Sequence, residues 1–201
     1  MNTVDLESIQ QINRLWNPVY PHLARHIAEV YGRRNGNVVE IGPFSGVIFS
    51  LARGGIGSSS VIASFPAGMA DSYRREAREA GLADRVAVIE SDPALTGLDD
   101  ASVDLAVFRG AFFFPSLFRI DLSAVERVLT PGGVGFVGGG FGKYTPNSVL
   151  LDMGKRSREL NLSIGKIEMS EQALRNVIAD SNLKAPVTVI DEGGLWAIIR
   201  K

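Results

Sequence analysis

A short apolar strand that runs directly into a glycine-punctuated turn constrains the fold of this chain more than any other feature. Val38, Val39 and Ile41 flank one acid, Glu40, and a turn with two glycines follows over residues 42–46. Glycine permits a sharp turn and a close approach of the backbone to a ligand. A helix expected over 47–53 would point free N–H groups and the positive end of its dipole above that turn. We therefore expect a ligand site at the carboxyl end of this strand.

Strand and helix patterns alternate along the rest of the chain. Strands are expected at 37–41, 60–64, 86–89, 103–108 and 134–138, with helices at 67–80 and 122–129. Helices at 148–159 and 171–181 precede two last strands, 187–191 and 195–199, joined by a Gly193-Gly194 hairpin turn. Such alternation predicts an α/β fold. We expect a Rossmann-like, seven-stranded, mostly parallel sheet with helices on both faces and an antiparallel C-terminal hairpin strand.

The length of 201 residues suits one domain. Ile9, Ile12, Leu15 and Trp16 recur at helical spacing, and Pro21 is placed to open a second helix. Residues 1–35 are therefore expected to form N-terminal helices that cap a core over residues 36–201. We find no repeat or linker that would divide this domain.

Composition excludes several classes of function. The net charge of −1 does not favour nucleic acid or an anionic membrane, which leaves a small molecule as the expected partner. The chain has no cysteine, so disulfides, thiolate metal sites and a cysteine nucleophile are excluded. We see no signal peptide and no apolar run of roughly 18 residues, and we expect a cytoplasmic protein. The sequence does not indicate an oligomeric state.

The order of the motifs resembles that of class I S-adenosylmethionine (SAM) dependent methyltransferases. In a nicotinamide-binding turn the acid lies roughly 20 residues beyond the glycines, whereas Glu40 precedes Gly42 by two residues. Residues 127–133 (RVLTPGG) are similar to the R-V-L-K-P-G-G motif of small-molecule methyltransferases, and residues 102–107 (SVDLAV) to their fourth strand. With the segments around Arg109 and Gly193, these motifs resemble a type-11-like subgroup. The resemblance covers nearly the whole chain and implies a SAM-dependent enzyme.

The same resemblance implies a set of cofactor-binding residues: Glu40, Gly42, Pro43, Phe44, Gly46, Ser64, Asp92 and Arg109. Glu40 would orient the glycine turn or reach the amino group of SAM; alternatively, it only caps nearby backbone N–H groups. Gly42 and Gly46 would pass beneath the methionine moiety. Asp92 would hold the adenine amine, or else cap the segment after Pro93.

Two positions depart from the family pattern. Phe44 stands where many members have glycine, beside the implied cofactor. Ser64 ends the second strand, where the resemblance calls for an acid that accepts both ribose hydroxyls. A neutral hydroxyl cannot make that charged bidentate contact, and a charge-assisted hydrogen bond contributes roughly 1.5–3 kcal/mol. These departures keep a second hypothesis open: a catalytically silent methyltransferase-like domain that acts as a ligand sensor or partner subunit.

No single catalytic residue is evident, and the candidates are Tyr20, His26 and Arg109. A histidine on the capping helix could remove a proton near neutral pH; the alternative is that His22 and His26 form a solvated or helix-capping face. Arg109 could clamp a carboxylate of substrate or cofactor, or form a salt bridge within the protein. The histidine pair lacks further ligands at metal-binding spacing, so we expect no metal.

Three adjacent aromatic residues follow Arg109, namely Phe112, Phe113 and Phe114. They cannot all face one core, so at least one is expected to line a pocket or an interface. This indicates an apolar or aromatic substrate region. The leading prediction from the sequence is therefore SAM-dependent methyl transfer to an unidentified small molecule.

Overall fold

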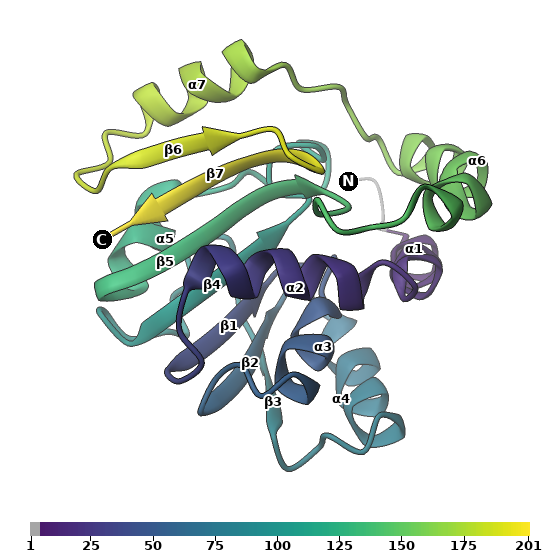
Figure 1. Ribbon diagram of the computed structural model, residues 1–201, viewed down its shortest axis with the longest axis horizontal. Coiled ribbons are helices and arrows are strands. Elements are labelled where there is room, and N and C mark those ends of the chain that lie inside the picture. The colour runs from purple at the N-terminus through teal and green to yellow at the C-terminus, as the bar shows by residue number, and fades with distance from the viewer. Residues whose placement is uncertain (1–4) are drawn as a thin grey trace.

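The computed structural model describes residues 5–201 and confirms the predicted α/β sheet (Figure 1). The strand order is β3-β2-β1-β4-β5-β7-β6. Strands β1 to β5 run parallel, and β7 is antiparallel to both of its neighbours, β5 and β6. The strands are β1 (Asn37–Ile41), β2 (Ser59–Ser64), β3 (Val86–Glu90), β4 (Val103–Arg109), β5 (Leu129–Gly140), β6 (Val187–Ile190) and β7 (Gly194–Arg200).

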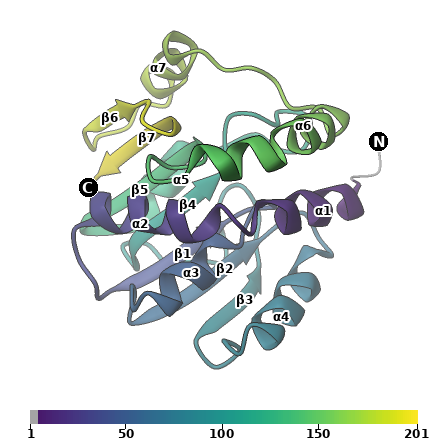
Figure 2. The ribbon, with the colours of Figure 1, turned by 45° about the vertical axis from the view of Figure 1, so that its right-hand side comes forward.

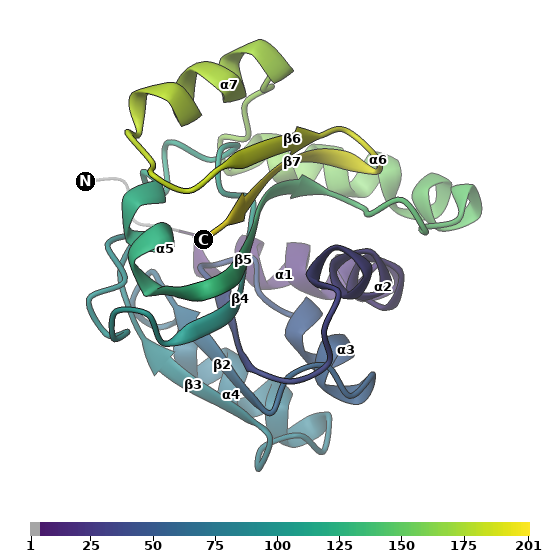
Figure 3. The same cartoon turned by 60° about the vertical axis from the view of Figure 1, so that its left-hand side comes forward.

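Helices lie on both faces of the sheet, as predicted. Figure 3 shows α2 (Tyr20–Tyr31) and α3 (Val47–Arg53) on one face and α5 (Leu122–Val128) on the other. Helix α4 (Met69–Glu79) packs on β2 and β3, and α7 (Glu171–Asp180) packs on β6. Helices α1 (Leu6–Trp16) and α6 (Asn147–Ser163) contact each other at one end of the molecule (Figure 2). None of the helices within residues 5–201 is long and apolar enough to cross a membrane.

Strand β5 begins earlier than the sequence predicts. The sequence places its start at Val134, with Thr130–Gly133 as a stop after the helix, but the structure begins the strand at Leu129. Leu129 pairs with Val103, and the register shifts before the next pairs. The N–H of Gly132 donates to the carbonyl of Lys201 at 2.6 Å. This pairing with the far end of the chain satisfies the backbone of a segment that reads locally as a turn.

The strand order places the expected ligand site where the sheet changes direction. Chain growth reverses between β1 and β4, so their connections leave in opposite directions and open a crevice at their carboxyl ends. Strands β1 and β4 are bonded side by side, with Glu40 opposite Val107. Beyond the exposed Asn37, both strands are largely buried and apolar, apart from Glu40, Asp104 and Arg109. Two buried ionisable groups, Glu40 and Arg109, therefore end up on neighbouring strands near this crevice.

Candidate functional site

A cleft of about 490 Å³ lies beyond the carboxyl ends of β4 and β5. This volume is in the range of small-molecule pockets. Its walls come from α1, the turn after β1, the segment after β4, the glycines of β5 and β7, and α6 with the chain that follows it. The lining side chains include the aromatic residues Trp16, Phe44, Phe113, Phe114 and Phe141.

Arg109 is the buried charge of this cleft. It ends β4, lines the cleft and is only 4% exposed. Its Nε donates to the carbonyl of Phe44 at 2.9 Å, and Nη2 donates to the hydroxyl of Tyr20 at 3.0 Å. The guanidinium carbon lies 4.8 Å from the ring centroid of Trp16 and 4.7 Å from that of Tyr20. Within residues 5–201 it takes part in no ion pair, so the salt-bridge alternative is wrong.

Glu40 is fully buried and holds the first turn of α3. One carboxylate oxygen accepts from the N–H groups of Gly46 at 2.8 Å and Ile48 at 2.9 Å, and the other accepts from Val47 at 3.3 Å. The prediction that α3 points free N–H groups at a ligand is therefore wrong, because Glu40 occupies them. The acid orients the glycine turn; contact with the amino group of SAM stays a prediction.

Burial also changes the ionisation of Glu40. It raises the pKa of this carboxyl from 4.5 to about 7, against the opposing effects of the Arg109 charge and of the three backbone donors. An ionised carboxylate is costly to bury. Near neutral pH, part of the protein therefore holds Glu40 in its neutral form.

The rest of the glycine turn is held by side chains of α1, α2 and α4. The carbonyl of Pro43 accepts from Asn13 Nδ2 at 2.9 Å and from the Tyr73 hydroxyl at 2.5 Å. The same hydroxyl accepts from the N–H of Ser45 at 3.2 Å. A Cβ added at Gly46 would lie 2.6 Å from the ring of Tyr20, so only glycine lets that ring lie on the turn. The turn is thus a rigid, internally bonded structure.

Three aromatic rings, which we call the rim cluster, cover the other side of the turn: Phe65, Phe108 and Phe118. Their centroids lie between 5.4 and 5.9 Å apart. A Cβ at Gly42 would lie 2.9 Å from Phe108 and 3.3 Å from Phe65, so these rings pack directly on the glycine. Ser64 is sealed nearby: it is 2% exposed, and its hydroxyl has no hydrogen-bond partner among the described residues.

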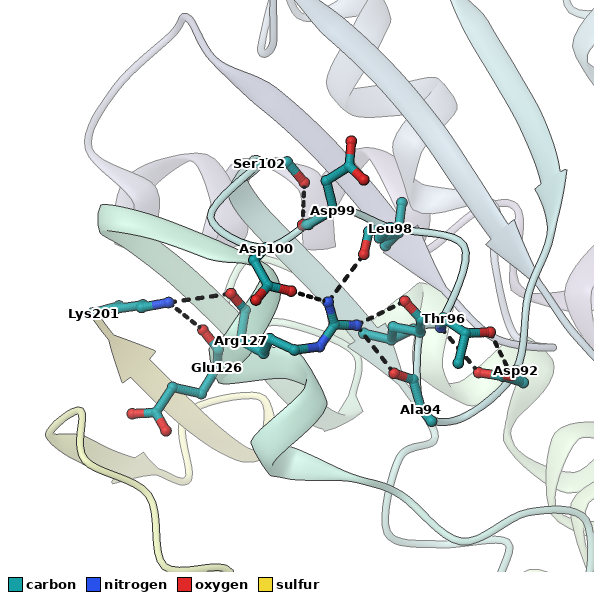
Figure 4. A network of polar contacts seen from close by, with 11 residues as sticks. Asp92, Ala94, Thr96, Leu98, Asp99, Asp100, Ser102, Glu126, Arg127 and Lys201 are labelled. Atoms are coloured by element: carbon teal, nitrogen blue, oxygen red, sulfur yellow. Dashed lines mark hydrogen bonds and ion pairs between the residues drawn. The ribbon is translucent and has the colours of Figure 1, made fainter.

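Asp92 lies in the loop after β3, where Arg127 fixes the backbone (Figure 4). Arg127 donates to the carbonyls of residues 94, 95 and 98 and pairs with Asp100. The two oxygens of Asp92 accept from the N–H and the hydroxyl of Thr96 at 3.2 and 2.7 Å. Asp92 therefore caps the segment after Pro93, which was the alternative interpretation of this residue. A contact between Asp92 and adenine stays a prediction.

The other catalytic candidates lie in different surroundings. Burial raises the pKa of the Tyr20 phenol above its usual range, so its hydroxyl keeps its proton beside Arg109. His26 is 1% exposed and packs edge-on against Phe136, so the prediction of a solvated face is wrong for it. Burial, with a contribution from Lys143, lowers the pKa of His26. Its side chain is not part of the cleft lining, so the structure does not bring it to the site.

The prediction that at least one of the three phenylalanines lines a pocket is confirmed; the substrate region inferred from them stays a prediction. Phe112 is buried in the core, whereas Phe113 is partly exposed and lines the cleft with Phe114. The sequence reasoning missed Trp16 as a wall residue and missed the contribution of α6. In the sequence, Trp16 is marked only by its helical spacing from other apolar residues, and the segment that forms α6 contains no motif. No cluster of three or more potential metal ligands occurs in the described part of the chain.

Comparison with solved structures identifies the fold. A protein from Methanococcus maripaludis assigned as a SAM-dependent methyltransferase matches with 24% identity and a TM-score of 0.79. The match covers all of this chain and 95% of that one. A SAM-dependent methyltransferase from Aquifex aeolicus matches with 18% identity and a TM-score of 0.63, over 95% and 98% of the two chains. The chain therefore has the class I methyltransferase fold.

A further similar structure contains ligands. Geranyl diphosphate C-methyltransferase from Streptomyces coelicolor A3(2), solved with Mg²⁺, geranyl diphosphate and S-adenosylhomocysteine, matches with 17% identity and a TM-score of 0.58. The match covers 88% of this chain and 74% of that one. No protein-family profile matches the sequence, and no curated protein matches it.

The residues at the rim agree with SAM only in part. The glycine turn and Glu40 lie at the carboxyl end of β1, beside the cleft. Ser64, which the resemblance assigns to the ribose, is 2% exposed, and the nearby rings of Phe65 and Phe108 pack on Gly42. A ribose can reach the Ser64 hydroxyl only if the side chains around it move.

Proposed function

We propose that this chain is a SAM-dependent methyltransferase that acts on a small apolar molecule held in the cleft. The observation that carries the proposal is the position of the cleft. It opens at the carboxyl ends of β4 and β5, next to the glycine turn, and Phe44, Arg109 and Gly110 belong to its lining. The class I fold supports the same function, since proteins that share it are SAM-dependent methyltransferases.

The chain's own residues supply position and exclusion of water. SAM, when bound, supplies a methyl group on a sulfonium for in-line displacement. Aromatic walls hold an apolar molecule and keep water out, and alignment of reacting groups can contribute several kcal/mol to the rate. Neither Tyr20 nor His26 is placed as a base, because the first is a buried neutral phenol and the second lies away from the cleft. We therefore assign neither residue as a base; a base is required only if the attacking atom of the acceptor has to lose a proton.

Calorimetry with S-adenosylhomocysteine tests the proposal. Wild-type protein is expected to bind it, with an affinity reduced by the free energy needed to displace the rim cluster. Phe65→Leu makes the displaced ring smaller, and we expect binding about tenfold tighter, which corresponds to about 1.4 kcal/mol. Phe49→Leu, a buried ring on α3 outside the rim, is the matched control and should leave the affinity unchanged.

Ser64→Asp alone is a poor test of this site. Ser64 is sealed, so an aspartate there would bury a carboxylate without a partner and destabilise the fold. The substitution becomes informative together with Phe65→Leu, which makes room for a ligand. In that double variant, the added acid should tighten binding further, again by roughly tenfold for one charge-assisted hydrogen bond.

The rim cluster favours a second candidate function, a ligand-binding domain on the same fold that performs no methyl transfer. Its specific support is the packing of Phe65 and Phe108 on Gly42 together with the sealed Ser64. The calorimetry distinguishes the two. No heat and no thermal shift with wild type at millimolar SAM and S-adenosylhomocysteine would contradict methyl transfer and support the binding domain.

A further inference from the structure

We infer that the cleft binds a flat apolar molecule that carries a carboxylate, and that Arg109 receives this carboxylate. The inference rests on the proposed function only in giving that molecule the role of methyl acceptor. The binding itself follows from the side chains of the cleft.

First, Arg109 carries a buried charge that takes part in no ion pair within residues 5–201. Arg109 is 4% exposed, and its two hydrogen bonds go to neutral partners, the carbonyl of Phe44 and the hydroxyl of Tyr20. Burying a charge without an ion pair is costly. The buried acid on the neighbouring strand, Glu40, accepts from three backbone N–H groups at the start of α3, and it forms no ion pair with Arg109. An anion in the cleft would give Arg109 the direct ion pair that the residues of the described chain do not.

The second argument is the donor count of the guanidinium. A guanidinium carries five N–H donors. Nε uses one for Phe44, and Nη2 uses one for Tyr20. Both donors of Nη1 and the second donor of Nη2 have no recorded partner within residues 5–201. Adjacent donors on Nη1 and Nη2 match the two oxygens of one carboxylate.

The third argument is the shape and chemistry of the walls. Trp16 and Tyr20 lie against the guanidinium and restrict the approach to its edge. The ring centroids of Phe44 and Phe114 lie 4.3 Å apart, with the ring planes tilted by 34°. Phe113 packs directly on Gly139, because a Cβ added at this glycine would lie 2.6 Å from its ring. These surfaces suit a planar apolar body. The remaining cations of the lining, Arg158 and Lys166, lie at its exposed edge.

A fluorescence titration tests the inference without any cofactor. Trp16 lines the cleft, whereas Trp196 is fully buried, so a ligand in the cleft should change the Trp16 emission. The probes are 2-naphthoate, its neutral counterpart 2-naphthamide, and 2-naphthyl phosphate. We expect wild type to bind the naphthoate at least tenfold more tightly than the amide. Equal affinities for the two would overturn the inference, and tighter binding of the phosphate would overturn the carboxylate assignment.

Variants assign the effect to Arg109. Arg109→Gln should remove the preference for naphthoate over naphthamide, because it removes the positive charge. Arg109→Lys should retain part of the preference, because lysine keeps the charge but lacks the paired donors of the guanidinium. Arg175→Gln, an exposed arginine on α7 outside the cleft lining, is the control and should leave the preference intact. Far-UV circular dichroism and melting temperature establish that each variant is folded. The comparison of naphthoate with naphthamide on wild type stands even if Arg109→Gln does not fold.

The same variants separate this inference from the proposed function. If Arg109→Gln loses S-adenosylhomocysteine but keeps the preference for naphthoate, Arg109 binds the carboxylate of the cofactor, and the inference is overturned. If wild type binds naphthoate as described but neither SAM nor S-adenosylhomocysteine, the inference stands and methyl transfer fails.

Discussion

At the scale of single residues, the glycine turn depends on the hydroxyl group of Tyr73. The Tyr73 hydroxyl donates to Pro43 and accepts from the N–H of Ser45 and from Asn13. Tyr73→Phe leaves the buried N–H of Ser45 without this partner and removes one of the two hydrogen bonds to the Pro43 carbonyl, and we expect it to lower the free energy of unfolding by about 2 kcal/mol. Urea denaturation measures this. Tyr144→Phe, an exposed contact to Glu29, should change stability by less than about 0.5 kcal/mol. Equal effects would contradict the role given to Tyr73.

Glu40 gives the protein a predictable pH dependence. Its pKa is raised from 4.5 to about 7, so the folded state binds a proton that the unfolded state releases between these values. The stabilisation is complete below pH 4.5 and is lost as the pH rises through 7. Relative to Glu40→Gln, wild type should therefore lose stability on the order of 3 kcal/mol from pH 4.5 to above 7. Urea unfolding at several pH values measures the difference, and a difference that stays constant with pH would refute it.

Arg127 acts at the scale of an element, because it holds a whole loop that lacks secondary structure. Its guanidinium bonds three carbonyls between residues 94 and 98 (Figure 4). Arg127→Gln should speed hydrogen exchange of the backbone amides in residues 94–100 at least tenfold, as local opening becomes easier. Arg175→Gln removes an exposed pair with Glu171 on α7 and serves as the control. Unchanged exchange in this loop would show that the loop is held by other contacts.

The elements were predictable from the sequence where local pattern decides them. The apolar strands and the glycine and proline breaks predicted the strands along the chain and the C-terminal hairpin, because each signal lies within its own segment; the order of the strands within the sheet was not predicted. The early start of β5 was not predictable, since the backbone of Pro131–Gly133 is satisfied by pairing with Lys201 at the other end of the chain. The buried state of His26 likewise depends on Phe136, a residue on a distant strand.

At the scale of the whole molecule, the sequence predicted which edge of the sheet carries the candidate site but not which side chains fill it. The turn after β1 and Arg109 at the end of β4 meet because parallel strands bring their carboxyl ends to one edge. The occupation of that edge by Phe65 and Phe118 required tertiary packing, which no local pattern encodes. The same holds for the wall supplied by α6, whose sequence carries no motif. The departure at Ser64 was the one sequence signal that pointed to an altered nucleoside region.

SAM is expected to bind with its methionine moiety over the glycine turn and its nucleoside at the carboxyl ends of β2 and β3, after the rim cluster moves. The most direct measurement is a crystal structure of wild type grown with millimolar S-adenosylhomocysteine. We predict that it shows the adenosine at the carboxyl ends of β2 and β3, with the ring of Phe65 turned away from Gly42. A structure that keeps Phe65 and Phe108 packed on Gly42, with the nucleoside absent from that edge, would contradict it.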